Sequence, residues 1–87
     1  MAKLNSQQRT TLEEIFSRPT RPNIRWSDAE GLLRALGIEV SEGRGSRVRL
    51  HYQGLRMVLH KPHPRPEMVR GAVEDLREFL SRAKLQP

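Results

Sequence analysis

Two short runs of alternating apolar residues, which meet at Gln53-Gly54, constrain the fold of this chain more than any other feature. The first run contains Val48, Leu50 and Tyr52, and the second contains Leu55, Met57 and Leu59. An apolar period of two is typical of β-strands, and a glycine that can take a positive φ suits the turn between two paired strands. The pattern predicts a hairpin of strands over residues 46–52 and 55–60, joined by a two-residue turn.

The register of this hairpin decides which side chains share a face. A two-residue turn places residues 52, 50 and 48 opposite residues 55, 57 and 59, so every pair on one face is apolar. On the other face the pairs are His51 with Arg56, Arg49 with Val58, and Arg47 with His60. We therefore expect one face of the hairpin in the core and the other face exposed and almost wholly cationic.

Helical patterns surround the hairpin. Apolar residues at helical spacing predict helices over residues 6–17, 27–36 and 67–83, and a short alternation predicts a further strand over residues 38–41. Ser27 with Glu30 has the spacing of a capping box, which marks the expected start of the second helix. The order helix, helix, three strands, helix predicts an α+β fold, in which a three-stranded antiparallel sheet has its helices on one face.

The first and last helices raise two narrower expectations. In the first helix, Leu12, Ile15 and Phe16 need burial, so this helix either covers the core or contacts a second copy of the chain. In the last helix, Arg77 and Arg82 are expected on the solvent-facing side. The place of the first helix therefore decides whether the whole chain packs as one unit.

Length and composition exclude several classes of protein. The chain has 87 residues, of which 36% are hydrophobic, and this suits one small domain with a thin core. No apolar run approaches the ~20 residues that span a bilayer. The start of the chain lacks the apolar stretch of a signal peptide, so we expect a cytoplasmic protein without membrane contact. The absence of cysteine excludes disulfides, thiolate metal sites and cysteine nucleophiles.

The net charge of +6 comes from one window of the chain. Residues 43–66 contain no acidic residue, all three histidines, and six of the sixteen Lys and Arg residues; the other ten basic residues balance the ten acidic residues. Guanidinium groups match the geometry of phosphate oxygens, so the window predicts a nucleic-acid partner in preference to an ordinary solvated face. The predicted cationic face has no aromatic residue, which favours recognition of RNA backbone and shape over stacking of bases.

Three histidines lie in this window. Cleavage of RNA without a metal needs a base for the 2′-hydroxyl proton and cations for the phosphate, and His60 opposite Arg47 combines the two. His51 opposite Arg56 offers the same combination, and His63 lies on a proline-rich connector from which it can reach either pair. The alternative interpretation is that these are surface histidines without a catalytic role. No cysteine or carboxylate accompanies His60 and His63 in the connector, so neither a metal site nor a cofactor is predicted.

The glycines add one open question. Gly71 falls within the last predicted helix, where a glycine costs ~1 kcal/mol relative to alanine. With Arg70 beside it, the glycine either permits the close approach of a phosphate or permits a tight crossing of two helices. Gly43-Arg44-Gly45, in contrast, lacks the strand-to-helix context of a nucleotide-binding loop.

Four short motifs follow one another in a recognisable order. They are Gly45-Ser46-Arg47, the hairpin, the connector over residues 61–64, and Arg70-Gly71. In this order they resemble the HicA toxins of bacterial toxin–antitoxin pairs, over residues 27–83. The resemblance implies an amino-terminal extension over residues 1–26 and a HicA-like domain over residues 27–87, with a double-stranded-RNA-binding-domain-like fold. It further implies a ribonuclease that cleaves mRNA and is neutralised by a HicB antitoxin, which we expect to cover the cationic face.

At one position the chain departs from the family's pattern. The family's presumed catalytic histidine matches Arg47, and a guanidinium cannot act as a base at neutral pH. Three arrangements stay open: Arg47 binds phosphate while His60 is the base, which we favour; His51 is the base; or the chain is a module that binds RNA or its partner without cleavage. RNA contacts are expected at Arg44, Ser46, Arg49, Arg56, Lys61, His63, Arg65, Arg70 and Gly71.

Overall fold

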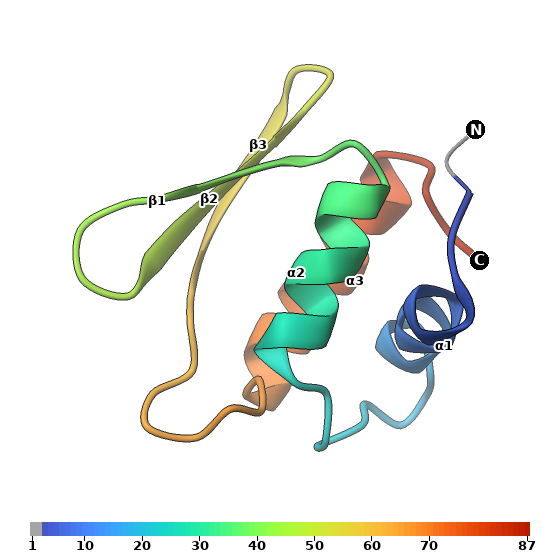
Figure 1. The fold of residues 1–87 in the computed structure, drawn as a ribbon, viewed down its shortest axis with the longest axis horizontal. Coiled ribbons are helices and arrows are strands. Elements are labelled where there is room, and N and C mark those ends of the chain that lie inside the picture. The colour runs from blue at the N-terminus through green and yellow to red at the C-terminus, as the bar shows by residue number, and fades with distance from the viewer. Residues whose placement is uncertain (1–2) are drawn as a thin grey trace.

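The computed structural model describes residues 3–87, so residues 1 and 2 of the predicted extension lie outside the described part of the chain. Its elements are, in order, α1 (Ser6–Ile15), α2 (Trp26–Ala35), β1 (Glu39–Glu42), β2 (Arg47–Tyr52), β3 (Leu55–His60) and α3 (Arg70–Arg82). The three helices lie on the same side of a three-stranded sheet (Figure 1). The predicted α+β fold is confirmed, and the order α-β-β-β-α from α2 onward is consistent with a double-stranded-RNA-binding-domain-like architecture.

The sheet has the order β1-β2-β3, and both pairings are antiparallel. All six predicted pairs of the hairpin are confirmed, from Tyr52–Leu55 at the turn to Arg47–His60 at the far end. The turn is two residues long, and both Gln53 (φ 47°) and Gly54 (φ 87°) have positive φ, as a type I′ turn requires. The short local connection thus fixes the register of the whole hairpin.

The core lies between the sheet and the helices. The sheet contributes Val40, Val48, Leu50 and Leu59, and α2 and α3 contribute Ala29, Leu32, Leu33, Val73, Leu76 and Leu80. Because the helices occupy only one face of the sheet, the side chains on its other face are exposed. Among residues 3–87, no helix has the length and apolar character needed to cross a membrane.

Helix α1 packs into the same core as the rest of the chain. Leu12 and Ile15 are buried in one cluster with the residues of α2, α3 and the sheet, so of the two roles expected for this helix it takes the first, covering the core. Arg77 of α3 fastens it there: its guanidinium donates to the carbonyls of Ile15 (2.7 Å) and Ser17 (3.2 Å) just where α1 ends. The expected solvent-facing position of Arg77 is therefore wrong, because the carboxyl end of α1 covers it.

The chain before α2 pairs with the chain before α3 in a short antiparallel bridge. The amide of Trp26 donates to the Pro66 carbonyl (2.9 Å), and the amide of Met68 donates to the Ile24 carbonyl (2.7 Å). Ile24, Trp26 and Met68 are all buried. The bridge holds the first turn of α2 against the connector that links β3 to α3.

Two helix starts differ from the sequence prediction. Helix α3 begins at Arg70 and not at residue 67, because the bridge keeps the preceding residues extended. Helix α2 begins at Trp26, and its N-cap, Arg25, makes no side-chain capping hydrogen bond, so the predicted capping box of Ser27 with Glu30 is wrong. In both cases pairing between distant segments overrides the local signal.

Candidate nucleic-acid interface

The exposed face of the hairpin carries a compact group of basic side chains. β2 contributes Arg47, Arg49 and His51, and β3 contributes Arg56, Val58 and His60; we call these six residues the cationic sheet face. All six are exposed, and the register places them in three directly opposite pairs. The Cβ atoms of such pairs lie about 4.5–5.5 Å apart, so one phosphate can contact side chains from both strands.

The arginines of the cationic sheet face are not neutralised by acidic side chains. Within residues 3–87 the ion pairs are Arg34–Glu30, His51–Glu39 and Lys61–Glu42. None of them involves Arg47, Arg49 or Arg56, and no hydrogen bond within the described chain occupies their guanidinium groups. Their charge and their donors are therefore available to an anionic ligand.

His60 and Arg47 form the last pair of the hairpin. Immediately beyond them, the amide of Lys61 donates to the Ser46 carbonyl (2.8 Å). Hydrogen-bonded and non-hydrogen-bonded pairs alternate along an antiparallel ladder, so His60 and Arg47 are a non-hydrogen-bonded pair, whose side chains approach more closely. This geometry brings an imidazole and a guanidinium together on one open surface.

His51 has a different environment. Its Nδ1 lies 3.4 Å from Oε1 of Glu39, the opposite residue on β1, and Arg56 is opposite on β3. Both partners of the contact with Glu39 are largely exposed, so it contributes little to stability. It nevertheless turns one ring nitrogen toward a carboxylate and leaves Nε2 for other contacts.

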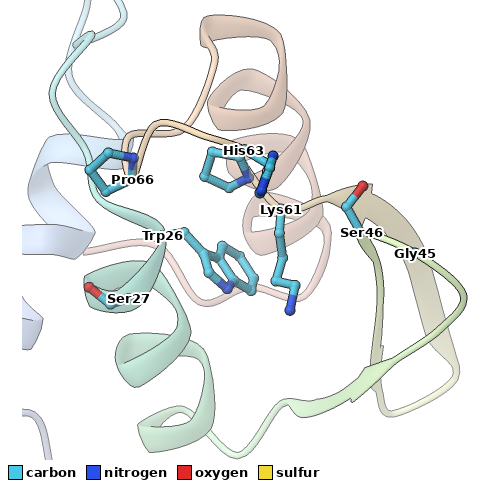
Figure 2. Close-up of a pocket in the computed structure, with 8 residues that line it drawn as sticks. Trp26, Ser27, Gly45, Ser46, Lys61, His63 and Pro66 are labelled. Atoms are coloured by element: carbon cyan, nitrogen blue, oxygen red, sulfur yellow. The ribbon is translucent and has the colours of Figure 1, made fainter.

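A pocket lies next to the end of the hairpin, and we call it the connector pocket (Figure 2). One side is formed by Trp26 and Ser27 at the start of α2, and another by Gly45 and Ser46 before β2. Lys61, Pro62, His63 and Pro66 of the connector complete it. Its volume is about 640 Å³, within the range of small-ligand sites, and it opens to solvent.

The residues expected to contact RNA fall into separate groups in the structure. Ser46, Lys61 and His63 line the connector pocket. Lys61 also pairs with Glu42 (Nζ to Oε2, 2.9 Å), which neutralises part of its charge. Arg65 and Arg70 line a different surface hollow together with Pro22 and Val69.

Arg44 and Gly71 lie outside these groups. Arg44 is exposed in the turn between β1 and β2. Gly71 is the second residue of α3, and a Cβ built on it meets no atom within 4 Å outside its own helix turn. The tight helix crossing considered for this glycine is therefore wrong.

Trp26 and Ser27 were not predicted from the sequence as members of a site. The strands carry no exposed aromatic residue, and Trp26 precedes the connector by more than thirty residues, so periodicity gave no reason to place them together. The pairing of Trp26 with Pro66 creates the neighbourhood. The only sequence signal is that the one tryptophan of the chain stands at the start of a helix.

The α-β-β-β-α order and the single cationic sheet face define a small α+β domain with an open basic surface. The model of the family described as "HicA toxin of bacterial toxin-antitoxin" matches residues 26–85, from the first residue of α2 to just beyond α3. This chain therefore belongs to the HicA toxin family, whose members are toxins with a cognate antitoxin partner. No curated protein and no solved structure matches the chain.

Proposed function

We propose that this toxin binds RNA on the cationic sheet face and acts on mRNA in the cytoplasm as a metal-independent endoribonuclease. The observation that carries the proposal is the set of unpaired arginines Arg47, Arg49 and Arg56 on a face that no other described element covers. Each guanidinium presents a planar fork that matches phosphate oxygens. Because the rest of the chain is neutral, the net charge is concentrated in the window that contains this cluster, which favours a polyanionic partner.

In the proposed reaction, the imidazole of His60 takes the proton of a ribose 2′-hydroxyl. The resulting oxygen attacks the adjacent phosphorus, and the bond from phosphorus to the 5′-oxygen of the next nucleotide breaks. The products are a 2′,3′-cyclic phosphate and a 5′-hydroxyl, which receives a proton from an acid or from water. Arg47, directly opposite His60, stabilises the negative charge that develops on the phosphate oxygens.

His51 is the second candidate for the base, because it alone has a carboxylate beside its ring. A carboxylate at Nδ1 orients an imidazole and fixes its tautomer, which leaves Nε2 to accept a proton. Arg56 is its opposite residue and takes the phosphate-binding role in this arrangement. Among residues 3–87 no carboxylate pairs with His60, which lies at the end of the hairpin next to the connector pocket but on the opposite face of the sheet.

The cleavage proposal is tested by purifying the wild-type chain, His60→Ala and His51→Ala and following cleavage of a labelled mRNA in the presence of a chelator. Loss of a general base lowers the rate by about 10²–10⁴-fold, so His60→Ala should lose cleavage and His51→Ala should keep it. RNA binding, measured by fluorescence anisotropy, should persist in both variants. Loss in His51→Ala alone transfers the role to His51. A wild-type chain that binds RNA without any cleavage contradicts the nuclease proposal and supports a binding module.

We further propose a HicB-like antitoxin that covers the cationic sheet face. Charged groups there, together with the exposed Val58 (54% accessible), suit a partner surface with acidic residues around an apolar contact. The charge-reversing substitutions Arg49→Glu and Arg56→Glu should abolish capture of the antitoxin, whereas Arg18→Glu, far along the chain from this face, should not. Equal effects of all three substitutions would place the antitoxin elsewhere.

A further inference from the structure

We propose that the connector pocket binds one unpaired nucleobase of the RNA strand that crosses the cationic sheet face. The inference rests on the proposed RNA binding and adds to it a site that contacts a nucleobase directly. It makes single-stranded RNA the substrate at this end of the hairpin.

The pocket lies at the same end of the hairpin as the reacting pair, on the side of the sheet that the helices cover. Ser46 and Lys61 line it, and they are the next pair of the hairpin after Arg47 and His60. Successive side chains of a strand point to opposite faces, so Ser46 and Lys61 point to the helix side while Arg47 and His60 point to the open side. A strand held by Arg47 therefore reaches the pocket by passing around this end of the hairpin.

The lining suits a flat, partly polar group. The rings of Pro62 and Pro66 and the accessible part of the Trp26 indole supply apolar surface, and Ser27 and Ser46 are polar residues of the lining. In Figure 2 the indole extends from the start of α2 toward the connector. A ribose phosphate gains nothing from such apolar surface, whereas a base packs against the proline rings and the accessible part of the indole and hydrogen-bonds through its edge.

The walls of the pocket are held in place before any ligand binds. The amide of Trp26 is bonded to the Pro66 carbonyl (2.9 Å), and Trp26 is only 8% accessible, so most of the indole is fixed in the core and only a small part of it faces the pocket. On the other side, Lys61 is held by Glu42 (2.9 Å). A site ordered in advance loses less entropy when a ligand binds.

Base pairing excludes a duplex from this pocket. Bases in double-stranded RNA are stacked inside the helix, and extruding one costs a few kcal/mol. An unpaired base avoids that cost. The pocket therefore adds selectivity for single strands to a sheet face whose charge alone binds any RNA.

The single tryptophan of the chain makes a direct test possible. The wild-type protein is titrated with a short single-stranded RNA, a duplex of the same length, and an abasic ribose-phosphate oligomer of the same length, while Trp26 fluorescence and the anisotropy of a label on the oligomer are recorded. The single strand should change Trp26 fluorescence saturably, and the other two should bind by anisotropy without that change. An equal change with the abasic oligomer would overturn the proposal.

A substitution that fills the pocket provides the second test. Ser27 is exposed, so Ser27→Leu adds bulk beside Trp26 without disturbing the core, and Thr10→Leu on the exposed surface of α1 is the matched control. Ser27→Leu should weaken binding of the single strand about tenfold, leave the abasic oligomer unaffected, and shift the positions of cleavage. Unchanged single-strand binding would refute the pocket even if RNA cleavage stands. A base-dependent change without any cleavage would support the pocket and contradict the nuclease instead.

Discussion

Arg47 and His60 lie directly opposite each other on β2 and β3, at the end of the hairpin remote from its turn. The position that the family resemblance matches to a catalytic histidine thus holds a guanidinium, and an imidazole stands across the strand from it. In the proposed reaction His60 is the base and Arg47 is the cation that metal-free cleavage of RNA needs.

The first prediction concerns Arg47. If it stabilises charge on the phosphate, Arg47→Ala should lower the single-turnover cleavage rate about 100-fold, and Arg47→Lys should recover part of the loss, because an ammonium keeps the charge without the planar fork. Arg44→Ala, in the neighbouring exposed turn, removes the same charge and should have a small effect. Equal losses of cleavage rate for Arg44→Ala and Arg47→Ala would mean that Arg47 contributes only general electrostatic attraction of the RNA.

A second prediction concerns the salt dependence of RNA binding. Each phosphate contact that is lost reduces the slope of log K against log salt by about 0.7 for a single strand. Substituting Arg47, Arg49 and Arg56 together by Gln should therefore reduce the slope by about 2. The control replaces Arg18, Arg21 and Arg82, which are exposed elsewhere, and makes the same change in net charge. A comparable reduction in the control would show that the sheet face is not the contact surface.

The hairpin was predictable from the sequence because its determinants are local. A two-residue turn and a period of two fix both the register and the faces, so the pairing of Arg47 with His60 followed from a few adjacent residues. The connector pocket was not predictable in this way, since it needs Trp26 to meet Pro66 across the chain. The predicted solvent-facing position of Arg77 is wrong for the same reason. Helical periodicity places Arg77 outside the apolar stripe of α3, but the end of α1 packs against that side of the helix.

A third prediction concerns the ion pair of Lys61 with Glu42. Glu42→Gln releases the ammonium and should raise RNA affinity a few-fold at low salt, with a change in the free energy of unfolding below about 1 kcal/mol, because the carboxylate is largely exposed. Glu13→Gln on the exposed surface of α1 changes the net charge equally and should have a smaller effect. Anisotropy titrations of both variants make the comparison, and identical affinities would mean that Lys61 does not contact RNA.

A fourth prediction concerns Arg77, which joins α1 to α3. Its guanidinium donates to Ile15, to Ser17 and to the hydroxyl of Thr20 (2.9 Å), so Arg77→Ala leaves half-buried carbonyls without a donor. The free energy of unfolding, from urea denaturation, should fall by about 2–3 kcal/mol. Arg77→Lys should recover only part, since one ammonium cannot reproduce the fork. Arg82 lies further along α3 and is exposed, so Arg82→Ala should lower the free energy of unfolding much less. An equal loss in the two variants would contradict a stabilising role for the hydrogen bonds of Arg77.

The last prediction concerns the turn that sets the register. Gln53 has a φ of 47°, in the left-handed region that costs a residue with a Cβ about 1 kcal/mol or more. Asparagine tolerates this conformation and is preferred at the position in type I′ turns, so Gln53→Asn should raise the free energy of unfolding by about 0.5 kcal/mol. Gln53→Val should lower it, because a β-branched side chain is strained there. Urea midpoints with unchanged slopes measure both effects. A shift of the urea midpoint in the same direction for both variants would contradict the type I′ turn. The cross-strand pairing of Arg47 with His60 depends on that turn.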